Sequence, residues 1–328
     1  MSQYLLLKKL SVQNANAIAG LTYGFPAITN FLGFAHAISR KLPNEMGVQL
    51  GGVAVISHKN IVHARQPKGW GDYVFALSRN PLTHQGKTAP INEEGRMNMQ
   101  ISLLIEVSGV QAGNLSARDE LLHQVEKIIP NLRLAGGQIT EYEQPDLVDG
   151  EEATYTLRRL MPGFALIDQS QYLAEHYQTL LQQDGNACLL DAWCDFAQLK
   201  FKAEAPKDES EHAADGSDTA VLKAEWHYEP KPKSGYLVPI NCGYCAISPV
   251  YEAGKVANVR DQTTPVVFAE SAYSIGEWKS VHALEIQNAV WRYEHQYPWY
   301  LAKTEPFQSQ SIAPDDLENE SSEEEMPY

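Results

Sequence analysis

The sequence lacks any long apolar run. A transmembrane helix needs about 20 consecutive apolar residues, and no stretch of the 328 residues approaches that length. The first residues, MSQYLLLKKLSVQ, place their apolar segment before the lysines and contain no small-residue cleavage site, unlike a secretory signal. We therefore expect a globular cytoplasmic protein without a membrane partner.

Cysteine is scarce as well. Four cysteines in a chain of this size do not make a disulfide scaffold, so we expect reduced thiols. Cys242 and Cys245 form a C-x-x-C pair, whereas Cys188 and Cys194 lack a usual zinc spacing. Two pairs that converge would give a tetrahedral sulfur site, but such residues are more often small buried hydrophobes. We expect no metal and no cofactor, and whether Cys242 and Cys245 bind a metal stays open.

Basic residues are outnumbered, with 26 Lys and Arg against 41 Asp and Glu and a formal net charge of −15. Spread evenly, this charge argues against a nucleic-acid partner, because phosphate binding depends on basic side chains. However, segments 204–218 and 305–328 hold fourteen of the carboxylates and one lysine. Residues 1–138 hold thirteen basic and eight acidic residues. An RNA-binding surface is therefore expected in that half.

Hydrophobic patterning between residues 4 and 139 predicts the order strand, helix, strands, helix, strand. The segments 72–79 and 96–107 are expected to pair as a hairpin with a projecting tip at 80–95, because Met97, Met99, Ile101 and Leu103 alternate with polar residues. The expected strands are 4–12, 47–58, 72–79, 96–107 and 132–139, and the helices follow Pro26 and run from an N-cap at Ser116 to Ile129. This order matches an α+β, ferredoxin-like (RRM-like) fold with an extra hairpin.

The second half is harder to interpret. Residues 155–171 show no helical period, 172–190 and 275–293 favour helices, and 235–275 favours β hairpins. The acidic segments 203–218 and 304–328 are expected to be a linker and a disordered tail. We thus expect an RRM-like domain at 1–153, a smaller β-rich part at 154–303, and the tail at 304–328.

Several residues of the first half have the chemistry of an RNA site. Single-stranded RNA is bound by aromatic stacking, by basic side chains on phosphates and by backbone amides at glycines. Residues 14–26 form an Asn- and Gly-rich loop after the first strand, and two glycines interrupt the last strand. The candidates are Asn14, Asn16, Tyr23, Phe25, Arg79, Lys87, Arg96, Arg133, Gly136 and Gly137. The ordinary interpretation is a core role for Tyr23 and Phe25 and a turn at the glycines.

A resemblance to a known family rests on a series of blocks in order. They are LSVQNANAIAGLTYGFPAITNFLGFAHAI, LSRNPL, INEEGR, RLAGGQI, RRLMPGFAL, GYLVPI, ISPVY and GEW. Together they resemble the Csy-two family, the type I-F branch of the Cas-five proteins in the RAMP superfamily. The blocks extend from about residue 5 to residue 280.

The resemblance implies a non-catalytic subunit of a CRISPR surveillance complex that caps the 5′ handle of the crRNA. It implies a ferredoxin-like domain with a thumb hairpin at 80–95, a handle-binding loop at 13–26 and a glycine-rich loop at 133–138, which adds Gln138. The implied partners are the handle, the large subunit and the backbone subunit, and a contact with target DNA near the PAM end stays open. Arg158 and Arg159 are further phosphate candidates by charge, against an ordinary solvated pair.

Two other functions stay open. An endoribonuclease that processes precursor crRNA would need a positioned histidine, and His36, His58, His63 and His84 are available. No spacing predicts a catalytic partner for any of them, and we expect His36 to be a core residue of its helix. The third possibility is a protein scaffold that does not contact RNA.

Overall fold

The computed structural model describes residues 3–111, 113–204 and 224–305. Most of the expected linker and tail lies outside the described residues. The helices are α1 (Ile28–Ser39), α2 (Leu115–Ile128), α3 (Gly150–Arg158), α4 (Ser170–Gln183), α5 (Leu189–Ala197) and α6 (Ile286–Ala289). In the described part of the chain, none of these helices has the length and apolar character that spanning a membrane requires.

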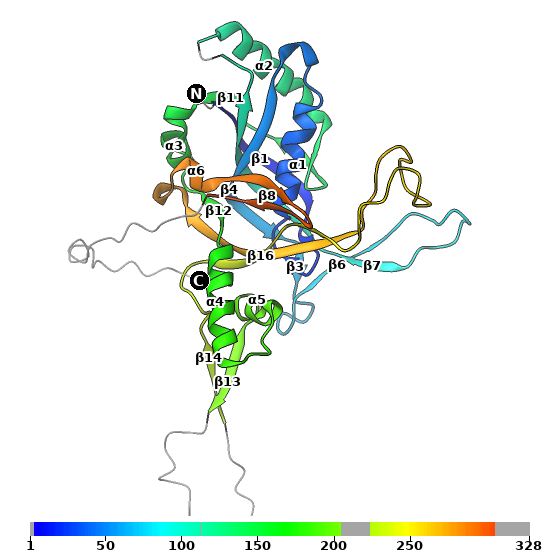
Figure 1. Ribbon diagram of the computed structural model, residues 1–328, viewed down its shortest axis with the longest axis vertical. Helices are drawn as coiled ribbons and strands as arrows, with labels where there is room; N and C mark the ends of the chain where they lie inside the picture. Colours follow the sequence, from blue (N-terminus) through cyan, green and yellow to red (C-terminus); the bar gives the residue numbers. More distant parts are fainter. Residues whose placement is uncertain (1–2, 112, 205–223, 306–328) are drawn as a thin grey trace, which may run out of the picture.

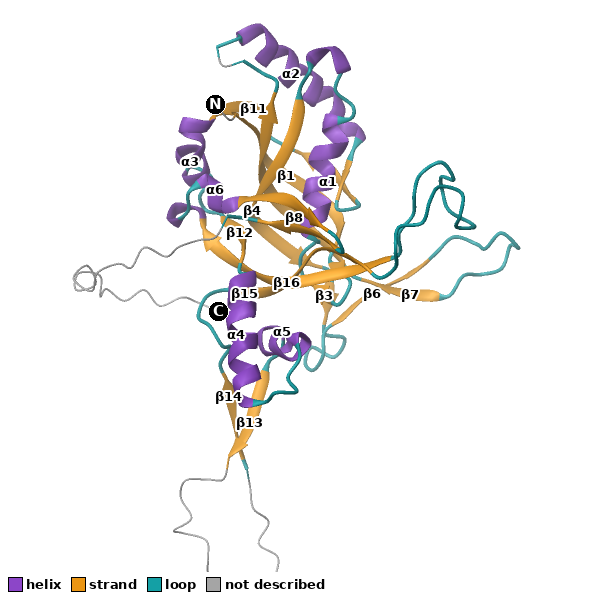
Figure 2. Ribbon diagram, viewed as in Figure 1, coloured by secondary structure: helices purple, strands orange, loops and turns teal. Residues whose placement is uncertain are grey.

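The first half forms an antiparallel sheet covered by two helices (Figures 1 and 2). Its strands are β1 (Gln3–Asn16), β4 (Gln49–Val62), β8 (Arg96–Ser108), β9 (Arg133–Leu134) and β10 (Gly137–Glu141). They lie side by side in the order β4-β8-β1-β10-β9, and each pairs antiparallel with its neighbour. Helix α1 connects β1 to β4, and α2 connects β8 to β9. The α+β class expected from the sequence is confirmed.

The alternating residues of β8 bury one face of this sheet. Met97, Met99 and Ile101 join a core cluster with α1 and α2, while the residues between them stay partly exposed. Helix α2 begins earlier than expected, because Asn114 is its N-cap and its side chain accepts a hydrogen bond from the Ala117 N–H at 3.1 Å. The predicted N-cap at Ser116 is wrong by two residues.

The second half extends the same sheet and closes part of it into a ring. Its strands are β11 (Asp146–Asp149), β12 (Phe164–Asp168), β15 (Leu237–Ala246), β16 (Ala269–Ser280), β17 (Val290–Gln296) and β18 (Trp299–Lys303). From β4 the order continues β17-β18-β15-β16-β12, and β12 pairs back onto β4. One edge of β4 therefore carries β8, and the other carries β17 at Val53 and β12 at Ser57. Strand β11 pairs with the start of β1.

A bidentate ion pair connects the first half of the chain to the second half beside β4. The Arg292 guanidinium on β17 donates from Nη2 to Glu106 Oε1 at 2.7 Å and from Nε to Oε2 at 3.1 Å. Glu106 Oε2 also accepts the backbone N–H of Gly52 at 3.0 Å. A side chain at Gly52 would overpack this junction, because its Cβ would lie 2.6 Å from both Glu106 Oε2 and Val290 Cγ1.

Three small sheets lie outside the large one. They are β2 (Ile18–Ala19) with β3 (Thr22–Tyr23), β5 (Ala64–Arg65) with β6 (Val74–Arg79) and β7 (Ile91–Glu94), and β13 (Lys200–Glu204) with β14 (Glu225–Glu229). The β6–β7 hairpin projects from the body beside the loop that follows β15 (Figure 1). The expected pairing of 72–79 with 96–107 is wrong, because β6 pairs with β7 whereas β8 is enclosed between β1 and β4.

The helices expected in the second half are partly wrong. Within 275–293 only Ile286–Ala289 is α-helical, next to a 3-10 turn at Val281–Ala283, because β16 and β17 pair on both sides in the sheet and this pairing overrides the local pattern. Helix α3 begins at Gly150 and ends at Arg158, so its last turn lies inside the stretch 155–171 that shows no helical period in the sequence. The helix expected within 172–190 is confirmed by α4, and α5 begins at the end of that range. The hairpins expected in 235–275 are confirmed by β15 and β16.

We predict that Gly52→Ala lowers the free energy of unfolding by about 1–3 kcal/mol, because the new methyl group overpacks the junction between β4, β8 and β17. Gly33→Ala is the matched control, since Gly33 is exposed in α1 and its Cβ would meet nothing within 4 Å. That control should be neutral or stabilising by up to about 1 kcal/mol. Denaturant unfolding of both variants measures this, and equal stability of the two would contradict the packing argument.

Candidate RNA-binding site

The end of β1, the start of β8 and the β9–β10 turn are distant in the sequence but meet at one end of the sheet. Asn16 of β1 lies opposite Arg96 of β8, and Gln13 of β1 lies opposite Gln138 of β10. Gln138 in turn pairs with Arg133 of β9. We call this group the strand-end cluster. Its members are Asn14, Asn16, Arg96, Arg133, Gly136, Gly137 and Gln138.

The glycines of the cluster have different structural roles. Ala135 and Gly136 form the two-residue turn between β9 and β10, with φ of +48° and +75°, as a tight hairpin turn requires. Gly136 is exposed and leaves its backbone open to a ligand. Gly137 is buried against β1, where a Cβ would lie 2.7 Å from the Gln13 carbonyl oxygen. Gly137 therefore allows close strand packing and does not present its own amide.

Both arginines of the cluster bind backbone carbonyl groups at its edge. Arg133 Nη1 donates to the Gly136 carbonyl oxygen at 3.3 Å, and Arg96 Nη1 donates to the Asn14 carbonyl oxygen at 3.5 Å. Arg96 Nε also donates to Glu94 Oε2 at 3.1 Å, and this bond lowers the pKa of Glu94. A guanidinium carries five N–H groups, so these contacts orient both side chains and leave donors for a phosphate.

The asparagines shape the end of β1. Asn14 is exposed and has a φ of +55°, a left-handed conformation that asparagine tolerates. Its backbone N–H donates to Asn98 Oδ1 at 3.1 Å. Asn16 donates from its backbone N–H to the Ala135 carbonyl oxygen at 2.8 Å and from Nδ2 to that of Ile18 at 2.6 Å. The loop after β1 is thus fastened to the β9–β10 turn.

A groove of about 300 Å³ continues from the cluster across the face of the sheet opposite α1 and α2. Its polar lining includes Lys59, Asn98 and Gln100. The sequence interpretation missed all three as site residues. The alternation of polar and apolar residues in 96–107 indicates Asn98 and Gln100, since every second residue of a strand lies on the same face and Arg96 begins that series.

The two aromatic candidates have different environments. Tyr23 is 73% exposed and touches Phe75 at the base of the β6–β7 hairpin, with ring centroids 6.1 Å apart. Phe25 is partly buried, stacks on Phe31 and makes a T-shaped contact with Trp278. The Phe25 ring packs against the core, as the ordinary interpretation of the sequence has it, and its contact with a base stays a prediction.

The remaining basic candidates lie apart from the cluster. Arg79 and Lys87 are exposed on the β6–β7 hairpin, at its strand end and in its tip. Arg158 ends α3 and binds Glu285 Oε1 at 2.8 Å, while Arg159 lies over the Tyr155 ring. Helix α3 follows β11, which pairs with the opposite end of β1. Arg158 and Arg159 are therefore not brought together with the other candidates.

The four histidines do not resemble a catalytic set. His36 is in α1 as expected but is exposed, so the expected core position is wrong: it lies on the face of α1 turned away from the sheet. His58 Nδ1 donates to the Pro162 carbonyl oxygen at 2.8 Å, and its Nε2 contacts Ser102 Oγ at 2.7 Å. Within residues 3–111, where all four lie, no hydrogen bond joins one of them to a carboxylate.

Comparison with known proteins supports the family resemblance that the sequence motifs indicated. The family described as "CRISPR-associated protein (Cas_Csy2)" matches residues 5–302. The CRISPR-associated protein Csy2 of Pseudomonas aeruginosa strain UCBPP-PA14 is 38% identical over 310 residues, which cover 90% of this chain and 92% of that protein. This chain belongs to the Csy2 family. The resemblance drawn from the sequence is thereby confirmed, including the assignment to type I-F CRISPR systems.

The cysteines of this Csy2-family chain differ in their exposure to solvent. Cys242 is buried and donates to the Ala272 carbonyl oxygen at 3.7 Å, while Cys188 is exposed at the start of α5. Burial, reinforced by the nearby Asp168 charge, raises the pKa of Cys242 to about 12. In the described ranges, no three His, Cys, Asp or Glu side chains group as metal ligands.

We predict that iodoacetamide at mildly alkaline pH alkylates the exposed Cys188 readily and the buried Cys242 at least about tenfold more slowly, because the thiolate is the reactive form and burial raises the pKa of the Cys242 thiol. Mass spectrometry of tryptic peptides over time measures both rates. Alkylation in denaturant is the control and should make the rates equal. Equal rates in the folded protein would show that Cys242 is not buried as described.

Proposed function

We propose that this chain is a non-catalytic RNA-binding subunit of the type I-F surveillance complex, and that it caps the 5′ handle of the crRNA. The large subunit and the backbone subunit are its proposed protein partners. We also propose that its first half is classed as ferredoxin-like (RRM-like), with the β6–β7 hairpin as thumb. The β-α-β-β-α-β order and the strand order β10-β1-β8-β4 support that class.

The strand-end cluster is the observation that carries the proposal. Residues from three separate segments place two guanidinium groups and an exposed turn glycine along one edge of the sheet. Guanidinium groups bind phosphates, and an exposed glycine lets a nucleotide backbone approach the main chain closely. The polar groove beside the cluster extends this surface over the open face of the sheet. RRM-like sheets bind single-stranded RNA on this face.

Capture of the handle requires binding and no turnover. Phosphate contacts would fix the strand at the cluster, and a base stacked on an exposed ring such as Tyr23 would contribute ~1–3 kcal/mol. The family membership supports a place in the complex, where neighbouring subunits would enclose the RNA. The engagement of both His58 ring nitrogens favours binding over the rival function, acid–base cleavage of precursor RNA.

We predict that Arg96→Ala and Arg133→Ala each weaken guide retention in the assembled complex. The logarithm of the RNA-binding constant falls linearly with the logarithm of the salt concentration. Removal of one phosphate contact should make the slope of this line shallower by about 0.7 for a single strand. Gly136→Val should also reduce retention, because valine is strained at a φ of +75°. RNA content is measured as the 260 to 280 nm absorbance ratio after washes of rising salt.

Arg158→Ala is the matched control, since Arg158 is ion-paired with Glu285 beyond the opposite end of β1. Its complex should retain RNA like the unchanged protein. Unchanged RNA content in the three cluster variants would refute the site. Specific cleavage of precursor crRNA by the purified chain without metal, abolished by one His→Ala change, would establish the endoribonuclease instead.

A further inference from the structure

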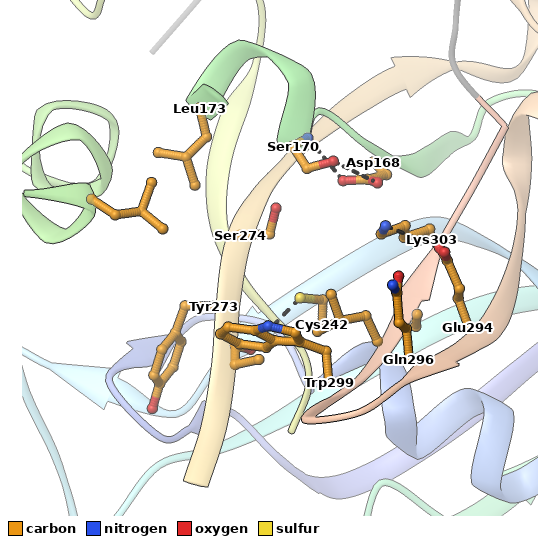
Figure 3. Close-up of a pocket in the computed structure, with 14 residues that line it drawn as sticks. Asp168, Ser170, Leu173, Cys242, Tyr273, Ser274, Glu294, Gln296, Trp299 and Lys303 are labelled. Carbon is orange, nitrogen blue, oxygen red and sulfur yellow. Dashed lines mark hydrogen bonds and ion pairs between the residues drawn. The ribbon is translucent and has the colours of Figure 1, made fainter. Parts of the chain in front are cut away.

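A second cavity, of about 290 Å³, lies between strands β15 to β18 and helices α4 and α5. Figure 3 shows Asp168, Lys303, Glu294 and Gln296 on one side of it and Leu173 and Tyr273 on the other, with Ser274 between them. The cavity thus has a polar side and an apolar side. Such a combination suits a flat heterocycle with hydrogen-bonding groups on one edge.

A buried hydroxyl in the wall of this cavity has no partner. Ser274 is 5% exposed, and its Oγ makes no hydrogen bond within the described residues. Buried polar groups are nearly always satisfied, so an unpaired one calls for a ligand or a water. Ser274 lines the cavity, but its Oγ exposes less than 1 Å² there, so this hydroxyl reaches a ligand only after a rotation about the Cα–Cβ bond.

The polar side of the cavity favours hydrogen-bond donors over phosphate. Asp168 and Glu294 contribute two carboxylates, whereas Lys303 contributes one ammonium group, which is bound to Glu294 at 2.9 Å. Asp168 already accepts hydrogen bonds from Ser170 N–H and Oγ at 2.9 and 3.0 Å. These bonds fix the carboxylate, whose oxygens have further lone pairs to accept a donor. A phosphate would meet net negative charge here.

The cavity adjoins the loop that follows β1. The Tyr273 hydroxyl accepts the backbone N–H of Leu21 at 3.0 Å, and Tyr273 also lines the cavity. Leu21 lies in the proposed handle-binding loop, residues 13–26. On the other strand, the Trp299 ring lines the cavity and is 45% exposed. An indole face in this position is a stacking surface for a planar ring.

We propose that this cavity binds one nucleobase that swings out of the bound RNA strand, and that it selects a base with an exocyclic amino group. Trp299 stacks on the base, Asp168 and Glu294 accept hydrogen bonds from its amino edge, and the Ser274 hydroxyl, rotated toward the cavity, completes the set. Uracil is disfavoured because it has no amino group. The proposal rests on the proposed RNA-binding function and adds a base-selective position to it.

The test uses the assembled complex with its guide RNA and base-specific reagents: dimethyl sulfate for adenine and cytosine, and glyoxal for guanine. One amino-bearing handle base should be protected in the unchanged complex. Ser274→Ala and Trp299→Leu should each raise its reactivity by about tenfold, the loss expected for a stacked and hydrogen-bonded base. Trp226→Leu is the matched control, since Trp226 is 68% exposed on β14 and does not line the cavity.

A photocrosslinking arm distinguishes RNA from protein as the occupant. Leu189, which lines the cavity, is replaced by p-benzoylphenylalanine in the same complex. Crosslinks to RNA support the proposal, and crosslinks only to another subunit overturn it. Handle bases whose reactivity is equal in all variants, with RNA content unchanged, overturn it while the proposed function stands. Loss of RNA from the unchanged complex would instead contradict the proposed function.

Discussion

The pairing of β4 along both of its edges is the constraint on which the rest of the structure depends. One edge carries β8, and the other carries β17 and then β12, so a single strand joins the antiparallel unit of the first half to the ring of the second. Gly52 allows the approach of β17, and the Glu106–Arg292 ion pair crosses the same junction. A partly buried, bidentate pair is strongly oriented, so it fixes the strands in register there.

This junction leaves the far end of the sheet free for binding. Strands β1, β8 and β10 extend beyond the ring, and their ends bring Arg96, Arg133 and Gly136 together. The tight β9–β10 turn and the hydrogen bonds of Asn14 and Asn16 hold these groups in place before any ligand binds. Preorganised donors lose little entropy on binding, which suits a subunit of the Csy2 family that is proposed to retain one RNA permanently.

The local charge of each surface, and not the net charge of the chain, determines which ligand that surface suits. The chain has a formal net charge of −15, yet both guanidinium groups of the strand-end cluster lie in the half where basic residues exceed acidic ones. Carboxylates predominate in the second cavity, where Asp168 and Glu294 outnumber the one lysine, Lys303. Phosphates suit the first surface and amino groups suit the second. The two proposed sites would therefore complement different parts of one nucleotide strand.

The sequence by itself determined the α+β class, the strands and helices of the first half, and the family, because periodic apolar residues and ordered motif blocks are local signals. It did not determine which strands pair. The β6–β7 hairpin, the strands in place of the helix at 275–293 and the ring through β12 depend on contacts between residues far apart in the chain. For the same reason only the tertiary structure showed which candidate residues lie together. Arg96 and Arg133 meet at the strand-end cluster, whereas Arg158 binds Glu285 and Phe25 packs against the core.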